Sequence, residues 1–169
     1  MSIYDDLLSD DVSVVSKGLD DLDASLRMKN DHSDLLGTLL MLSMSPDTVI
    51  VQKVTWCAAK MGQNKVKDKR IPSLLVCLAG SIDEIVRENV AWGIGEAAGT
   101  VEMADDCMSA ISLLLDDHEK EVRGMAAWAA GRVYHKCFCM DDEIKMKLRG
   151  LLNDPSEYVR EAAKFALDD

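Results

Sequence analysis

Residues 86–95 decide the fold, because their sequence, VRENVAWGIG, is one copy of a pattern that recurs along the chain. Trp92 in this stretch has counterparts 36 residues away on either side, Trp56 and Trp128, and Phe165 follows after another 37. A branched apolar residue stands six residues before each aromatic residue: Ile50, Val86, Val122 and Val159. Two residue classes that keep one period indicate internal repeats of about 36 residues.

Helix start signals keep the same period. Ser and Asp cap helix N-termini, and one of them stands five residues before each branched residue. The predicted N-caps are Asp10, Ser45, Ser81, Asp117 and Asp154. From each cap we expect a helix of about 16 residues that ends at a glycine or polar turn, as at Gly62 and Gly99. Shorter apolar helices precede the caps over residues 35–42, 71–78, 108–115 and 144–152. One unit is therefore two helices and two turns.

Length and composition agree with an all-α domain. The chain has 169 residues, the length of one ordinary domain, and 48% of them are hydrophobic. Helix-forming residues dominate, and alternation of apolar and polar residues with a period of two is almost absent. Since neither helix of a unit can bury its apolar stripe alone, the units are expected to stack into one continuous solenoid.

Three stretches, residues 86–95, 117–123 (DHEKEVR) and 154–163 (DPSEYVREAA), resemble the HEAT-repeat family, particularly the short HEAT-like or bilin-lyase-type repeats of bacteria and archaea. The resemblance implies a right-handed α-α superhelix of about five helix pairs, with the second helix of each pair on the concave side. The corresponding repeats are 1–30, 33–62, 70–99, 103–136 and 141–169. The resemblance also implies structural ion pairs between Asp117 and Arg123 and between Asp154 and Arg160.

The aromatic residues of the pattern are predicted to face away from the core of their own repeat. At about 100° per residue, Trp92 lies roughly 240° from Val86, whereas Val90 and Ile94 share the stripe of Val86. The same calculation holds for the other repeats and gives a candidate partner-binding surface. Its residues are Trp56, Trp92, Trp128, Phe165, Ile85, Glu88, Glu96, Glu121, Arg132 and Tyr158. Large aromatics also pack between helices, so the sequence leaves open whether this row is an exposed groove or inter-repeat packing.

Charge limits the classes of partner. Asp and Glu number 30 against 19 Lys and Arg, a net charge of −11, which disfavours nucleic acid and anionic membranes. Residues 1–34 are strongly acidic, which we interpret as a solubilising first repeat in preference to a dedicated site for a basic ligand. Residues 60–70 form a basic loop, which we interpret as a solvated turn in preference to a contact for an acidic partner. The N-terminus lacks the pattern of a signal peptide, and five cysteines with ten methionines fit a reducing compartment, so a cytoplasmic location is expected.

No constellation of residues with catalytic or cofactor chemistry is found. Gly93 and Gly95 fall inside a predicted helix, which excludes a phosphate loop. HEAT-repeat deoxyhypusine hydroxylases bind iron through several His-Glu pairs. This chain has one such pair, His118-Glu119, so that iron site is not expected. Cys137 and Cys139 lack the second ligand cluster that structural zinc requires. We therefore predict a protein that is not an enzyme, with neither cofactor nor metal.

The function predicted from the sequence is a protein–protein interaction or scaffold module that binds a partner segment in an aromatic-lined concave groove. The alternative is an accessory subunit of a bilin-lyase-like or other enzyme system, which is based on fold analogy alone. A role in nucleic-acid repair would need a basic groove, and this one carries Glu88, Glu96 and Glu121. The sequence leaves the oligomeric state open, including end-to-end association of copies.

Overall fold

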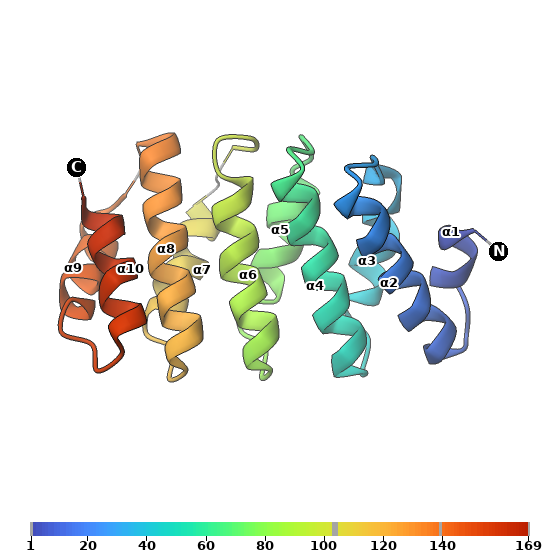
Figure 1. Cartoon of the computed structure of the whole chain (residues 1–169), viewed down its shortest axis with the longest axis horizontal. Helices are drawn as coiled ribbons and strands as arrows, with labels where there is room; N and C mark the ends of the chain where they lie inside the picture. The colour runs from blue at the N-terminus through green and yellow to red at the C-terminus, as the bar shows by residue number, and fades with distance from the viewer. Residues whose placement is uncertain (1, 103–104, 139, 169) are drawn as a thin grey trace.

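The computed structural model describes residues 2–102, 105–138 and 140–168, which form two layers of helices (Figure 1). Within these ranges the only β-structure is an isolated bridge between Ala98 and Val101. A 3-10 turn, Ser33–Leu35, leads into α3. The α-helices of the described ranges are α1 (Ile3–Leu7), α2 (Val12–Arg27), α3 (Leu36–Leu42), α4 (Thr48–Gln63), α5 (Arg70–Cys77), α6 (Glu84–Ala97), α7 (Asp105–Leu115), α8 (Lys120–Cys137), α9 (Asp142–Leu151) and α10 (Glu157–Leu167).

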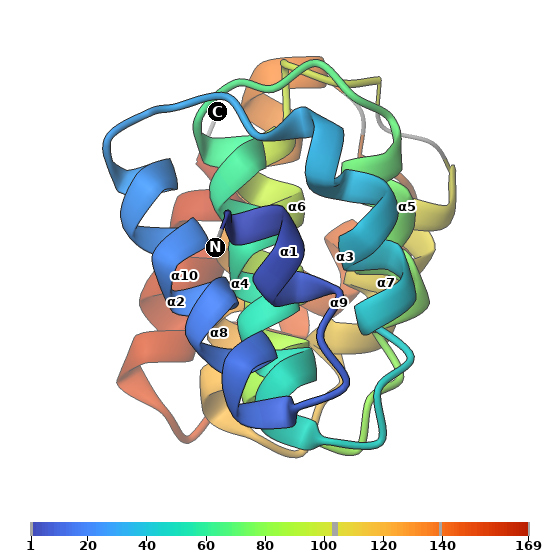
Figure 2. The same cartoon turned by 90° about the vertical axis from the view of Figure 1, so that its right-hand side faces the viewer.

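The even-numbered helices stand side by side in one layer, and α3, α5, α7 and α9 form the second layer behind them (Figures 1 and 2). The two chain ends lie at opposite ends of the stack (Figure 1). Neighbouring even-numbered helices pack on each other far more extensively than neighbouring odd-numbered ones do. The prediction of an all-α solenoid of stacked helix pairs is confirmed.

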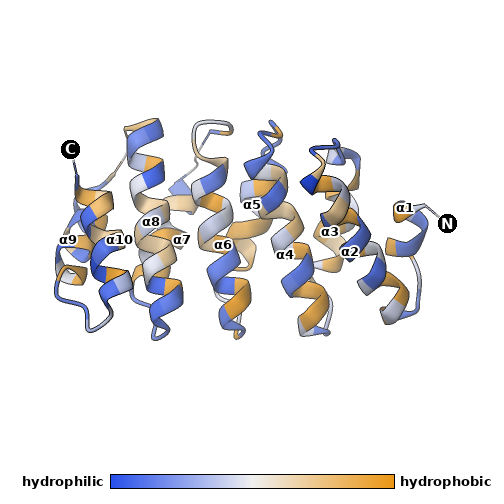
Figure 3. Ribbon diagram, viewed as in Figure 1, coloured by the Kyte–Doolittle hydropathy of each residue, from blue (hydrophilic) through white to orange (hydrophobic). Residues whose placement is uncertain are grey.

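The core lies between the two layers, where the sequence pattern placed it. The stripe predicted for α6, which includes Val86, Val90 and Ile94, has no exposed area, and the corresponding stripes of α4 and α8 are buried in the same way. Leucines of the short helices, such as Leu74 and Leu114, fill the space opposite these stripes. On the visible side of the even-numbered helices, hydrophilic and hydrophobic residues are mixed (Figure 3).

The predicted N-cap positions are wrong by two residues. The helices begin after Asp47, Asp83, Glu119 and Ser156, and the carboxylates of Asp47 and Asp83 accept hydrogen bonds from amides of the first helical turn. The Ser and Asp residues of the pattern form the preceding turn instead, where Ser45 Oγ accepts a hydrogen bond from the amide of Asp47. Both positions hold residue types that favour caps and turns, so composition alone does not separate them.

The first repeat is also shifted by one residue. Ser9, rather than Asp10, has the turn role, because its hydroxyl accepts a hydrogen bond from the amide of Asp11, the N-cap of α2. Turn positions at 9, 45, 81 and 117 therefore keep a spacing of 36 residues.

One of the two predicted glycine helix ends is confirmed. Gly99 follows α6 with φ +77°, a left-handed conformation that glycine adopts without strain. Gly62 lies inside α4, where an added Cβ would stand 3.3 Å from Cβ of Ala97 on α6. Its role is close helix packing, and Lys65 takes the left-handed position after α4 with φ +67°.

The prediction pairs each aspartate with the arginine six residues later, whereas the ion pairs in the structure join each aspartate to an arginine of the preceding repeat. Arg123 binds the carboxylate of Asp154 in the next repeat through Nε and Nη2, at 2.8 and 3.1 Å, and donates to the carbonyl oxygen of Asp117 in its own repeat. Arg87 binds Asp117 in the same two-pronged way, at 2.6 and 3.0 Å. These bonds tie successive repeats together, and the low exposure of Arg87 and Asp117 shields them from water.

Candidate functional site

The candidate site is the solvent-facing side of α2, α4, α6, α8 and α10, which we call the even-helix face. Trp56 on α4, Trp92 on α6 and Trp128 on α8 are half-buried there, and Phe165 on α10 is 40% exposed. Tyr158, at the start of α10, is 46% exposed. The face therefore presents an aromatic side chain from each of four consecutive long helices.

Trp56 and Trp92 stack directly on each other. Their ring centroids are 4.9 Å apart with an interplanar angle of 16°. Helix spacing alone predicts rings about 10 Å apart, so the two side chains lean together. Nε1 of Trp56 donates a 2.7 Å hydrogen bond to Asp23 of α2, and the ammonium group of Lys60 lies 5.7 and 5.8 Å from the two ring centroids. This stack links α2, α4 and α6.

Trp128 packs against a glycine of the preceding repeat. A Cβ added at Gly95 on α6 would stand 2.5 Å from Cζ3 of Trp128 and 3.1 Å from the backbone of Ala129. Only a glycine leaves room for the ring at this distance. The guanidinium carbon of Arg132, one helical turn further along α8, lies 5.7 Å from the Trp128 ring centroid, which is a cation–π arrangement.

The two aromatic residues of α10 use glycines of α8 in the same manner. A Cβ added at Gly124 would overlap the ring of Tyr158, at 2.1 Å, and one added at Gly131 would stand 2.8 Å from the ring of Phe165. The ring of His135 lies 5.4 Å from that of Phe165. Each ring thus has one side packed on a neighbouring helix, while part of its surface stays exposed to solvent.

A shallow hollow of about 320 Å³ opens on the face over α2, α4 and α6. Leu19 and Cys57 line its buried part, and Trp56, Ile85 and Asn89 are among the residues around it. Burial raises the pKa of the Cys57 thiol to about 12, so this thiol stays protonated at neutral pH.

The charged candidates lie on α6 and α8. Glu88 and Glu96 are half-buried on α6, and Glu121 is exposed at the start of α8. Burial, reinforced by the charge of Glu121, raises the pKa of Glu88. Burial also raises the pKa of Tyr158, with further contributions from Glu88 and Glu121. These three side chains, from three different helices, are therefore close enough to influence one another.

Two aspartates at the site escaped the sequence analysis of the face. Asp20 binds Lys53 at 2.7 Å, and Asp23 binds Trp56, whereas the sequence grouped both aspartates with a solubilising first repeat. The signal that could have found the aspartates is the period, because Asp20 lies 36 residues before Trp56.

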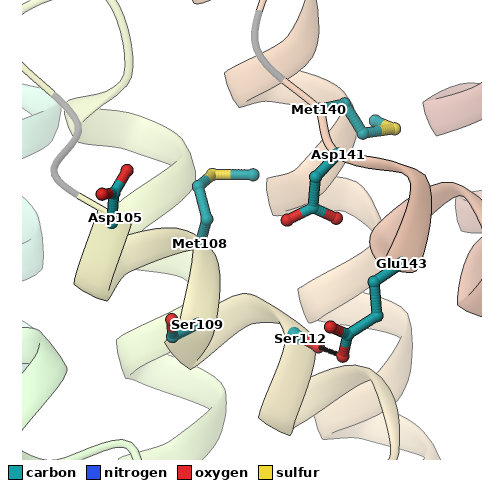
Figure 4. A pocket seen from close by; sticks show the side chains of 7 residues that line it. All are labelled: Asp105, Met108, Ser109, Ser112, Met140, Asp141 and Glu143. Carbon is teal, nitrogen blue, oxygen red and sulfur yellow. Dashed lines mark hydrogen bonds between the residues drawn. The ribbon is translucent and has the colours of Figure 1, made fainter.

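The opposite layer contains a hollow of about 450 Å³ between α7 and α9, with Asp105, Asp141 and Glu143 on its walls (Figure 4). Two of its carboxylates are used by the fold: Glu143 accepts a hydrogen bond from Ser112, and Asp141 caps α9. No group of three His, Cys, Asp or Glu side chains in the described part of the chain is placed to hold a metal ion. Cys139, considered above as a ligand, lies outside the described residues.

None of the helices in the described ranges is long and apolar enough to cross a membrane.

The stacked helix pairs and their inter-repeat ion pairs define a helical repeat solenoid. The family of HEAT repeats matches residues 71–168, more than half of the chain, and the protein belongs to this family. This repeat fold commonly serves as a protein-binding scaffold and is typical of proteins without enzymatic activity. No curated protein matches the sequence.

Solved structures share the fold at low sequence identity. An engineered protein is 19% identical with a TM-score of 0.74, covering 97% of this chain and 76% of that one. A designed armadillo repeat protein, solved in complex with the peptide (KR)4, is 17% identical with a TM-score of 0.70, covering 98% and 79%. A structure from work on microtubule plus-end tracking is 16% identical with a TM-score of 0.57, covering 95% and 73%.

Proposed function

We propose that the chain is a protein-binding module and that its even-helix face takes up a segment of a partner protein. The observation that carries this proposal is the row of aromatic residues on four neighbouring even-numbered helices, all on one side and all partly exposed. Tryptophan and tyrosine are enriched among the residues that dominate binding energy at protein interfaces. The proposed contact residues are Trp56, Trp92, Trp128, Phe165, Ile85, Glu88, Glu96, Glu121, Arg132 and Tyr158.

Packing of the rings on neighbouring glycines supports the proposal. A ring that is held on one side loses little conformational entropy when a partner covers the other side, which lowers the cost of binding. The close packing of the even-numbered helices is the arrangement expected on the inner, concave side of a curved stack. The designed armadillo repeat protein supplies a precedent for peptide binding by a solenoid of similar shape.

Peptide selection tests the proposal. A phage library of random dodecapeptides is selected on the immobilised full chain, and enriched peptides are then measured against two variants. Phe165→Ala removes a ring of the face, and Phe138→Ala removes a ring that is 84% exposed at the C-cap of α8 and is not among the proposed contacts. We expect Phe165→Ala to weaken binding at least 10-fold and Phe138→Ala to leave it within about 2-fold. Selection of nothing above the bare matrix, or equal effects of the two variants, would contradict the proposal.

A further inference from the structure

The chemistry of the partner can be read from the charges on the even-helix face. Three of its cations already have contacts within the face. Lys53 is bound by Asp20 and by Ser16, Lys60 by Gln63 and the stacked tryptophans, and Arg132 lies over Trp128. Lys53 and Lys60 are therefore occupied before any partner arrives, whereas, in the part of the chain that the structure describes, the buried Nε of Arg132 has no hydrogen-bond partner and its guanidinium has only the Trp128 ring beside it.

The carboxylates on α6 and α8 are not neutralised in the same way. Among the residues that the structure describes, no Lys, Arg or His forms an ion pair with the carboxylate of Glu88 or Glu96, and the ammonium group of Lys65 lies 3.4 Å from the backbone carbonyl oxygen of Glu96. Glu121 has only Lys120, its neighbour in sequence, at 3.8 Å, and both side chains are more than half exposed. The middle of the face therefore carries an excess of negative charge.

These carboxylates alternate with aromatic surface. Glu88, Trp92 and Glu96 are spaced four residues apart and form one stripe along α6, with the two carboxylates about 12 Å apart along the helix. In an extended peptide, side chains four residues apart are separated by about 13 Å. Tyr158, seated on Gly124 of α8, provides a second ring beside Glu88 and Glu121.

Lysine and arginine side chains match this pattern. Their aliphatic stems cover apolar and aromatic surface while the charged ends reach a carboxylate. A cation placed between Glu88 and Glu121 would also offset their mutual repulsion, which contributes to the raised pKa of Glu88.

We propose that the partner segment is basic and extended, and that its lysine or arginine side chains bind Glu88, Glu96 and Glu121 with their stems against Trp92 and Tyr158. This inference rests on the proposed function, because it specifies what the same face binds.

A matched-charge experiment tests the inference. The probe is a fluorescein-labelled octapeptide of alternating lysine and arginine, with an octapeptide of alternating glutamine and serine as the neutral comparison. The first variant, Glu88→Gln with Glu121→Gln, removes two charges from the face. The control, Glu102→Gln with Asp142→Asn, removes two exposed charges elsewhere on a chain whose net charge is −11. Titrations are read by fluorescence anisotropy in 0.15 M NaCl.

We expect the basic octapeptide to bind the parent chain, the face variant to bind it at least 10-fold more weakly, and the control variant to stay within about 3-fold. Equal weakening by both variants would show attraction by net charge alone and would overturn the inference, as would absence of binding to the parent chain. If selected dodecapeptides bind the aromatic row but lack basic residues, the inference fails while the proposed function stands. If no peptide of either kind binds, both fail.

Discussion

A methyl group added at Gly95 should destabilise the protein, because Trp128 occupies the space that the methyl group needs. The new Cβ would stand 2.5 Å from Cζ3 of Trp128 and 3.1 Å from Cα of Ala129. The ring cannot simply move aside, since the backbone of α8 is close as well. Overpacking of this kind costs about 1–3 kcal/mol, and the gain in helix propensity from glycine to alanine offsets up to about 1 kcal/mol. We expect a net loss of about 1–2 kcal/mol for Gly95→Ala.

Thermal unfolding followed by circular dichroism measures this effect. For a chain of this size, the expected loss lowers Tm by roughly 2–8 °C. The control is Gly37→Ala in α3, where an added Cβ meets nothing within 4 Å and where Tm should rise through helix propensity alone. In a Trp128→Ala background the clash with the ring is absent, so Gly95→Ala should cost at least about 1 kcal/mol less. A Tm at or above that of the parent chain for Gly95→Ala, or strictly additive effects in the double variant, would refute the placement of Trp128.

Three further predictions concern charged groups. Arg87→Ala leaves the buried carboxylate of Asp117 without its two-pronged partner and should cost about 3–5 kcal/mol in denaturant unfolding, whereas a loss below about 1 kcal/mol would show that the pair is exposed in solution. The hydrogen bonds from Arg123 lower the pKa of Asp154, so the stability they add is present above the ordinary aspartate pKa near 3.8 and is lost as the pH falls through the lowered value. Arg123→Ala should therefore flatten the decline of stability in acid, and an unchanged decline would contradict this prediction. The raised pKa of Glu88 has the opposite effect, since the favourable contribution of Glu88 to stability exists below the ordinary glutamate pKa near 4.5 and disappears as the pH rises through the raised value. Glu88→Gln should therefore raise Tm at pH 7 by less than about 4 °C and leave Tm unchanged near pH 3. A lower Tm of this variant at pH 7 would argue against an unneutralised carboxylate.

The repeat period predicts the fold because it constrains several residue classes together. The positions of Trp56, Trp92 and Trp128 fix the spacing of the long helices, and the branched residue six positions earlier fixes which side of each helix is buried. The exact start of each helix is not determined, because Ser45 and Asp47 both favour turns and caps. The structure selects Asp47, whose carboxylate reaches the amides of Val49 and Ile50.

Contacts between repeats are harder to obtain from the pattern. Arg123 lies six residues after Asp117 and 31 residues before Asp154, and sequence spacing alone favours the nearer aspartate. The folded stack brings the farther carboxylate to Nε and Nη2 and leaves the nearer residue to bond through its carbonyl oxygen. A periodic sequence places equivalent residues in every repeat, so it does not show whether a pair forms within one repeat or across two.

The same limit applies to the candidate site. A helical wheel gives the direction in which the Trp128 side chain points. It does not show how closely the ring packs on α6, which depends on the absence of a side chain at Gly95. Gly124 and Gly131 lie 34 residues before Tyr158 and Phe165, so a search for a small residue about one period before each aromatic residue would have indicated packing between repeats. Which part of each ring stays exposed follows only from the structure.

The central claim is that the aromatic row on the even-helix face binds a partner segment, and the ¹H–¹⁵N spectrum of the uniformly labelled chain tests it most directly. The three indole N–H groups, of Trp56, Trp92 and Trp128, each give a separate signal from the face itself. On titration with a selected peptide, we predict that at least two of the indole signals shift in a saturable way, while amides of α5, α7 and α9 keep their positions. Indole signals that stay fixed while amides of the odd-numbered helices shift would contradict the account.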